Sequence, residues 1–192
     1  MDKIIMTFPS SFYVSENLLE NKIVLDLQKR SKKIKKQYPR GGKNWICTTY
    51  NTCGTFDLLN DEYFKILLNK IEEKVFEFTK AHGSNYKYKT KQSWLNIYKN
   101  RDYQEFHHHA GNTFSAVYFL KSSKECAKLI FQNPTEPDML PIVDVKQFND
   151  LSFKTYSFEP IQNSLIIFRS YMIHMVELQT FDFERMSVAV NL

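Results

Sequence analysis

The second half of the chain, from about residue 91, is a succession of short apolar or alternating runs. Turn residues separate the runs, as in Gly111-Asn112, Asn133-Pro134 and Asn149-Asp150. Short runs with such spacers are typical of strands, and about eight in succession favour a jelly-roll or barrel. In order, they read KQSWLNIYK, FSAVYFL, KLIFQNP, PIVDVKQF, KTYSFEP, SLIIFRS, HMVEL and RMSVAVNL.

The first ninety residues have helical rather than strand periodicity. Apolar residues recur at helical spacing over residues 15–36, where Ser15 is a candidate N-cap. A second helix is predicted over residues 60–83, capped by Asn60 or Asp61 and ended by Gly83. WICTTYNT, residues 45–52, is expected to be a short strand. The sequence therefore predicts a mostly β protein with flanking helices (α+β). We expect one domain over residues 1–192, with a helical support region at 1–90 and a jelly-roll core at 91–192.

Charge and cysteine usage narrow the function classes. The net charge is +5, and much of the excess lies in residues 29–40. This basic segment favours a solvated helix face over a patch for nucleic acid. Three cysteines without CxxC spacing predict neither a disulfide framework nor a zinc ribbon. No apolar run suits a signal peptide or a membrane span, so we expect a cytoplasmic protein (host cytoplasm if viral) without a membrane partner.

Three of the five histidines are consecutive: His107, His108 and His109. In a strand, alternate side chains share a face, so His107 and His109 point one way and His108 the other. An HxH pair is a two-point clamp for Fe, Zn, Ni or Cu. Histidine clusters also occur on surfaces without a ligand. Glu105 shares this face by parity and is an alternative ligand, and a shift of frame to His108 with Ala110 is another.

Two further features lie downstream. His174 stands between two apolar runs, where it is either a packed core residue or a third ligand. Arg185 follows it by 185 − 174 = 11 residues and shares a strand face with Ser187. If that face lines a barrel interior, Arg185 is a buried cation that needs an anion, and a ligand carboxylate held bidentately is a candidate. The alternative is a surface ion pair with Asp182 or Glu184.

HxH, a distal His and a following Arg-x-Ser resemble the 2-oxoglutarate/Fe(II)-dependent oxygenases of the prolyl-hydroxylase-like superfamily. The chain looks most like the group found in phages and marine bacteria. The resemblance covers residues 44–192 and includes WICTTYNT, SWLNIYKNRDYQEFHHH, FSAVYFL, LIFQNP, NSLIIFRSYMIHMVE and ERMSVAVNL. It implies a double-stranded β-helix core. It also implies Fe(II), 2-oxoglutarate and O2 as cofactor and cosubstrates, and hydroxylation coupled to oxidative decarboxylation of 2-oxoglutarate.

The resemblance also implies residue roles. Fe(II) would be held by His107, His109 and His174. The far carboxylate of 2-oxoglutarate would pair with Arg185 and accept from Ser187, with Tyr98 and, less directly, Asn96 as further contacts, whereas Trp94 would serve in packing.

Three positions depart from the family pattern: His109, Arg101 and Ala116, which stands where relatives commonly have Gly. The wider superfamily has Asp or Glu where this chain has His109, so no protein carboxylate offsets the iron's charge unless Glu105 supplies one. Arg101 stands where relatives usually have Gly, in the turn before DYQ.

Two other functions stay open on the sequence alone. One is a cupin-like three-histidine metal enzyme that does not use 2-oxoglutarate. The other is a catalytically silent jelly-roll protein that binds nucleic acid or a partner protein through residues 29–40. For an oxygenase, the substrate is an unidentified small molecule or peptide, and a homodimer is an option. Residues 131–150 are expected to form a loop over the mouth of the barrel.

Overall fold

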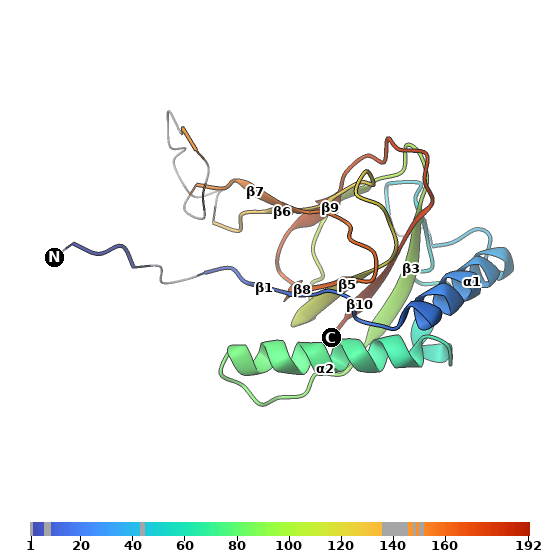
Figure 1. Cartoon of the computed structure of the whole chain (residues 1–192), viewed down its shortest axis with the longest axis horizontal. Helices are drawn as coiled ribbons and strands as arrows, with labels where there is room; N and C mark the ends of the chain where they lie inside the picture. Colours follow the sequence, from blue (N-terminus) through green and yellow to red (C-terminus); the bar gives the residue numbers. More distant parts are fainter. Residues whose placement is uncertain (1, 6–8, 43–44, 136–145, 148, 150–151) are drawn as a thin grey trace.

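A computed structural model describes residues 2–5, 9–42, 45–135, 146–147, 149 and 152–192 (Figure 1). In these residues, two antiparallel sheets lie one over the other, and two helices cover the outer side of one sheet. The larger sheet has the order β1-β8-β5-β10-β3-β2, and the smaller has the order β4-β9-β6-β7. The predicted fold class, a jelly-roll core with flanking helices, is confirmed.

The elements have the following bounds. The larger sheet consists of β1 (Phe12–Ser15), β2 (Tyr50–Asn51), β3 (Gln92–Tyr98), β5 (Phe114–Lys121), β8 (Leu165–Arg169) and β10 (Arg185–Asn191). The smaller sheet consists of β4 (Gln104–His107), β6 (Leu129–Gln132), β7 (Thr155–Phe158) and β9 (His174–Val176). The helices are α1 (Asn21–Gln37) and α2 (Lys65–Ala81), and a 3-10 turn covers Leu58–Asn60.

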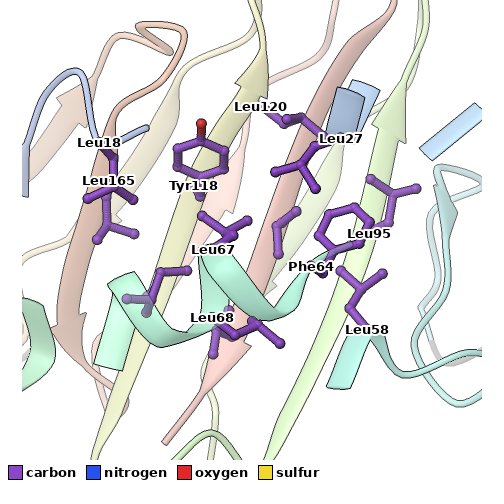
Figure 2. Close-up of a cluster of buried hydrophobic side chains, with 14 of the residues drawn as sticks. Leu18, Leu27, Leu58, Phe64, Leu67, Leu68, Leu95, Tyr118, Leu120 and Leu165 are labelled. Carbon is purple, nitrogen blue, oxygen red and sulfur yellow. The ribbon is translucent and has the colours of Figure 1, made fainter. Parts of the chain in front are cut away.

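Helix α2 forms within the predicted residues 60–83, but it begins at Lys65, and neither Asn60 nor Asp61 is its N-cap. The carboxylate of Asp61 accepts the backbone N–H of Tyr63 at 3.0 Å, so a capped turn leads into the helix. Gly83, at φ +76°, ends it in the left-handed conformation that glycine adopts without strain. The apolar face, which includes Leu67 and Leu68, packs against the larger sheet (Figure 2). This buried face fixes the helix against the outer side of the barrel.

Two expectations about local structure need correction. The first helix begins at Asn21 rather than after Ser15, because residues 12–15 pair with β8 as an edge strand. Asn17, at φ 51°, then turns the chain toward the helix. The strand expected at residues 45–52 shrinks to Tyr50–Asn51. The strand expected at residues 141–148 and the loop expected at 131–150 lie largely outside the described residues.

Strand β10 separates two cores. Its residues alternate as the sequence indicated, so one set faces the helices and the other faces the space between the sheets. The set that packs under the helices is Met186, Val188 and Val190. The set that faces the interior is Arg185, Ser187 and Ala189. The polar half of this strand therefore lies inside the barrel, where a ligand can reach it.

The basic segment lies on the last turns of α1 and just beyond it. Lys32, Lys33 and Lys36 are exposed, whereas Arg30 pairs with the buried carboxylate of Asp61 at 2.6 Å. Part of the segment's charge is therefore structural. None of the helices in the described residues combines the length and apolar character that a bilayer crossing requires.

Candidate active site

The three predicted histidine ligands come together at one end of the barrel. His107 ends β4 and His174 begins β9, and the two residues are directly paired across these strands. His109 follows β4, and its backbone N–H donates to the carbonyl of Ser170 at 3.0 Å. One ligand atom from each histidine lies within 4.8 Å of the others, and the Nε2 atoms of His109 and His174 are 3.3 Å apart. Two nitrogens that each lie about 2.1 Å from one ion at right angles are about 3 Å apart, so the pair fits a shared ion.

A β-bulge precedes the histidines. Gln104 pairs with Val176 and His107 pairs with His174, so 107 − 104 = 3 steps on β4 oppose 176 − 174 = 2 steps on β9. The extra residue breaks the strict alternation of faces. Both Gln104 and His107 line the interior cavity. On a regular strand, two residues three positions apart would point to opposite faces. Parity is therefore not a valid guide to the direction of Glu105.

Glu105 is held away from the histidine cluster. Its carboxylate accepts the backbone N–H of Ile46 at 2.8 Å and that of Cys47 at 3.3 Å. Although burial raises the pKa of Glu105, the hydrogen bonds from these amides lower it overall. The side chain belongs neither to the three-residue ligand group nor to the cavity lining. The expectation that it shares the ligand face is wrong, and the bulge is the reason.

Backbone carbonyls fix the orientation of two of the rings. Nδ1 of His107 donates to the carbonyl of Glu105 at 2.8 Å, and Nδ1 of His174 donates to that of Met172 at 2.9 Å. A proton held on Nδ1 leaves the lone pair of Nε2 free to bind a metal. Burial lowers the pKa of His109 to about 3 and holds that of His174 well below its ordinary value. The rings are therefore neutral near pH 7, as metal ligands must be.

Aromatic rings enclose the cluster. The Trp45 ring lies 4.8 Å from that of His107, and the Trp94 ring lies 5.6 Å from that of His109. Both tryptophans line the cavity. The side chain of His108 is exposed, as parity indicated. The alternative frame that uses His108 and Ala110 therefore has no ligand at the cluster.

Arg185 is a cation without a hydrogen-bond partner. It is 0% exposed, and none of its three guanidinium nitrogens has a hydrogen-bond partner within the described structure. Its Cζ lies 4.5 Å from the centre of the Tyr98 ring and 5.3 Å from that of Phe119. Burial lowers its pKa, and the neighbouring Tyr98 opposes part of this effect, although no hydrogen bond of normal geometry joins the two side chains. The surface ion pair with Asp182 or Glu184 is excluded, because a fully buried side chain cannot form one. The orphaned guanidinium thus fits an anionic ligand that enters the cavity.

The other predicted cosubstrate contacts lie beside Arg185. Tyr98 is its cross-strand neighbour on β3, and Asn96 faces Ser187 in the same ladder. All four side chains line one cavity, which encloses about 390 Å³ including its open mouth. Burial raises the pKa of Tyr98 to about 12, against the opposing effect of Arg185, so its hydroxyl remains a hydrogen-bond donor.

Sequence reasoning missed Trp45 and Gln104. Both line the cavity, and each has a buried nitrogen without a hydrogen-bond partner: Trp45 Nε1 and Gln104 Nε2. The bulge that turns Gln104 inward leaves no mark in the sequence. Glu105 anchors the two residues that follow Trp45 to β4 and so helps to hold Trp45 at the site.

The donor set defines what the site can do. Three neutral imidazoles on one side of an ion leave its other positions open to small ligands, as in non-heme iron oxygenases. An unpaired guanidinium further along the same cavity can hold the remote end of an acidic ligand bidentately. The arrangement therefore fits a metal ion and a carboxylic acid bound side by side.

Comparison by sequence identifies one family. The model of the family described as "Putative 2OG-Fe(II) oxygenase" (2OG, 2-oxoglutarate) matches residues 92–191, which include all seven predicted site residues. No curated protein matches the chain.

Comparison of structures identifies the same fold in prolyl hydroxylases. A prolyl-4-hydroxylase from Pseudomonas putida matches with a TM-score of 0.66 at 13% identity, over 95% of this chain and 92% of that one. A prolyl hydroxylase from Trichoplax adhaerens, in complex with a hypoxia inducible factor peptide fragment, has a TM-score of 0.65 at 14% identity, with 94% and 83% covered. The viral collagen prolyl hydroxylase of Paramecium Bursaria Chlorella virus-1 has a TM-score of 0.61 at 14% identity, with 94% of each chain covered.

Proposed function

The chain belongs to the 2OG-Fe(II) oxygenase family, and from this premise we propose that it hydroxylates a C–H bond of its substrate. Enzymes of this kind use Fe(II), 2-oxoglutarate and O2. When bound, the iron centre couples decarboxylation of 2-oxoglutarate to succinate and CO2 with insertion of the second oxygen atom into the substrate. The chain's own residues bind, orient and shield the reactants.

The proposed iron ligands are His107, His109 and His174. One ring nitrogen of each lies within 4.8 Å of the others, and backbone carbonyls lock two of the rings. His109 takes the position of the usual carboxylate. Glu105 is engaged by backbone amides and cannot serve two roles.

The observation that carries the proposal is the orphaned guanidinium of Arg185. A buried cation with three unpartnered nitrogens calls for an anion, and the far carboxylate of 2-oxoglutarate supplies one. Ser187, Tyr98 and Asn96 are proposed as additional contacts to it. A three-histidine enzyme that does not use 2-oxoglutarate, or a catalytically silent binding protein, would not explain why an unpaired guanidinium is buried at Arg185.

The substrate is proposed to be a peptide or a small molecule. The Trichoplax neighbour is in complex with a peptide fragment, which supports the peptide class. We further propose that residues 1–192 act as one domain, because α1 and α2 share a core with the larger sheet. We also propose a cytoplasmic location and a homodimer, with nucleic acid as the less favoured partner of residues 29–40.

Anaerobic titration of the metal-free protein with Fe(II) and 2-oxoglutarate tests the proposal. We expect one iron per chain, a weak visible charge-transfer band when 2-oxoglutarate is added, and succinate after O2 is admitted. His174→Ala should abolish iron retention and the band. His108→Ala, which alters an exposed neighbour of the ligands, is the matched control and should retain both. A band that survives His174→Ala, or none in the native protein, would contradict the assignment.

A further inference from the structure

Gln104 is a buried side chain whose amide nitrogen has no hydrogen-bond partner within the described structure. It is 5% exposed and lines the same cavity as the histidines and Arg185. Its Oε1 accepts a hydrogen bond from the thiol of Cys47 at 3.5 Å, whereas its Nε2 has no hydrogen-bond partner within the described structure. A buried donor left unpaired is costly, so a ligand that accepts from it would remove a penalty already present in the protein.

The larger sheet gives a scale for positions along the cavity. Trp94 lies beside His109 at the metal end, with ring centres 5.6 Å apart. Tyr98, four residues further along β3, pairs with Arg185. At about 3.3 Å per residue, the Arg185 end is about 13 Å along the sheet from the metal end.

Gln104 lies between these two ends. It pairs with Val176, two residues along β9 from the metal ligand His174, which is a shift of about 7 Å along the smaller sheet. Gln104 begins β4 directly after the turn that follows Tyr98, the last residue of β3 and the partner of Arg185, so the shift runs toward the Arg185 end. Gln104, Tyr98 and Arg185 also line the same cavity.

We propose that Gln104 is a further cosubstrate-binding residue, whose side-chain N–H donates to the far carboxylate of 2-oxoglutarate beside Arg185. A carboxylate has about four acceptor positions and a bidentate guanidinium occupies two, so two remain: Gln104 takes one, and Ser187, Tyr98 and Asn96 share the other. A five-carbon dicarboxylate whose oxo-acid end is at the histidines has its other end in this part of the cavity. The inference rests on the proposed function and adds a contact to it.

Cys47 is the positioning residue in this arrangement. Its thiol engages Oε1 of Gln104 and thereby directs Nε2 to the cavity. Its own backbone N–H is held by the carboxylate of Glu105, which also holds that of Ile46. The segment before β2 is thus tied to β4, and the amide of Gln104 is oriented before any ligand arrives. Such pre-orientation lowers the entropic cost of binding.

A pair of 2-oxo acids isolates the contact. 2-Oxopentanoate has the same 2-oxo-acid end as 2-oxoglutarate, but a methyl group replaces the far carboxylate. Each acid is titrated anaerobically into the Fe(II)-loaded protein, and dissociation constants are taken from calorimetry. Gln104→Met keeps the length of the side chain and removes the donor. It should weaken the binding of 2-oxoglutarate about tenfold to a hundredfold, as expected for the loss of a hydrogen bond to a charged group. The binding of 2-oxopentanoate should be unchanged.

Cys47 supplies a matched pair of variants. Cys47→Ala should weaken the binding of 2-oxoglutarate by a few-fold and leave the binding of 2-oxopentanoate unchanged. Cys47→Ser keeps a hydrogen-bond donor and should bind 2-oxoglutarate as the native protein does. Unchanged iron content and melting temperature show that each variant is folded. If Gln104→Met loses affinity for both acids equally, or loses affinity for neither, the inference is overturned.

The outcomes separate the inference from the function on which it rests. If the native protein binds no 2-oxoglutarate, or if Arg185→Met binds it as well as the native protein does, the proposed function fails. If both of those tests succeed and Gln104→Met still binds 2-oxoglutarate normally, only the inference about Gln104 fails.

Discussion

Arg185→Met should make the ligand-free protein more stable while it abolishes 2-oxoglutarate binding. In the absence of a ligand, the native protein buries a guanidinium with three unpaired nitrogens. The effective penalty for burying an unpaired ion is several kcal/mol. Two stacking rings, Tyr98 and Phe119, return about 2 kcal/mol each at most. The penalty and the stacking nearly balance, with the penalty larger.

Methionine changes this balance in one direction. Its thioether has a length similar to that of the arginine stem and keeps a sulfur–aromatic contact worth about 0.3–1.5 kcal/mol. Replacing a buried ionic group with an apolar side chain of similar volume commonly stabilises by about 1–4 kcal/mol. We expect about 2 kcal/mol here, which raises the melting temperature by about 4–8 °C for a chain of this size.

Thermal unfolding with and without 2-oxoglutarate measures both effects. When the 2-oxoglutarate concentration is a hundred times the dissociation constant, binding should stabilise the metal-loaded native protein by about 2.7 kcal/mol. The same concentration should leave the stability of Arg185→Met unchanged. Arg185→Lys, which keeps the charge without the planar fork, should gain no stability and bind the acid weakly. If Arg185→Met instead lowers the melting temperature of the ligand-free protein by several degrees, the guanidinium has an internal partner and the reasoning fails.

Two further predictions concern stability, each measured by urea unfolding. Arg101 adopts φ 72°, which costs a non-glycine residue about 1–2 kcal/mol, so Arg101→Gly should stabilise by about 0.5–1 kcal/mol after the entropy of glycine is included. Arg101→Ala keeps the strained backbone, and an equal gain in that variant would contradict the explanation. Leu67 is 0% exposed under the larger sheet, so Leu67→Ala should cost about 2–5 kcal/mol. Ile66, its 47% exposed neighbour, should tolerate alanine within about 0.5 kcal/mol, and similar losses at both positions would refute this packing.

The features that the sequence predicted best have a strong local period. Helix α2 follows from apolar residues at helical spacing, after a turn that Asp61 caps and with Gly83 beyond its end. Strand β10 follows from its alternation, which puts Arg185 and Ser187 on the interior face. The same alternation turned His108 outward. In each case the deciding interactions involve residues within a few positions of one another.

Errors occurred where distant segments decide the local structure. Residues 12–15 match either the start of a helix or a strand, and only the ladder with β8 selects the strand. Residues 45–49 look like a strand, but the carboxylate of Glu105 takes two of their amides and leaves little for a ladder. Neither partner is adjacent in the sequence, so no local pattern reveals the outcome.

The sequence by itself determined the residue types of the site, the strand face of Arg185 and the alternating pair of histidines, because side-chain direction in a strand is a local property. Only the tertiary structure decided that His174 meets this pair, that Glu105 does not, and that Gln104 enters the cavity. Those outcomes depend on one extra residue in the ladder between β4 and β9. A ladder's register is set by the packing of both strands against the rest of the barrel, and no stretch of either strand contains that information.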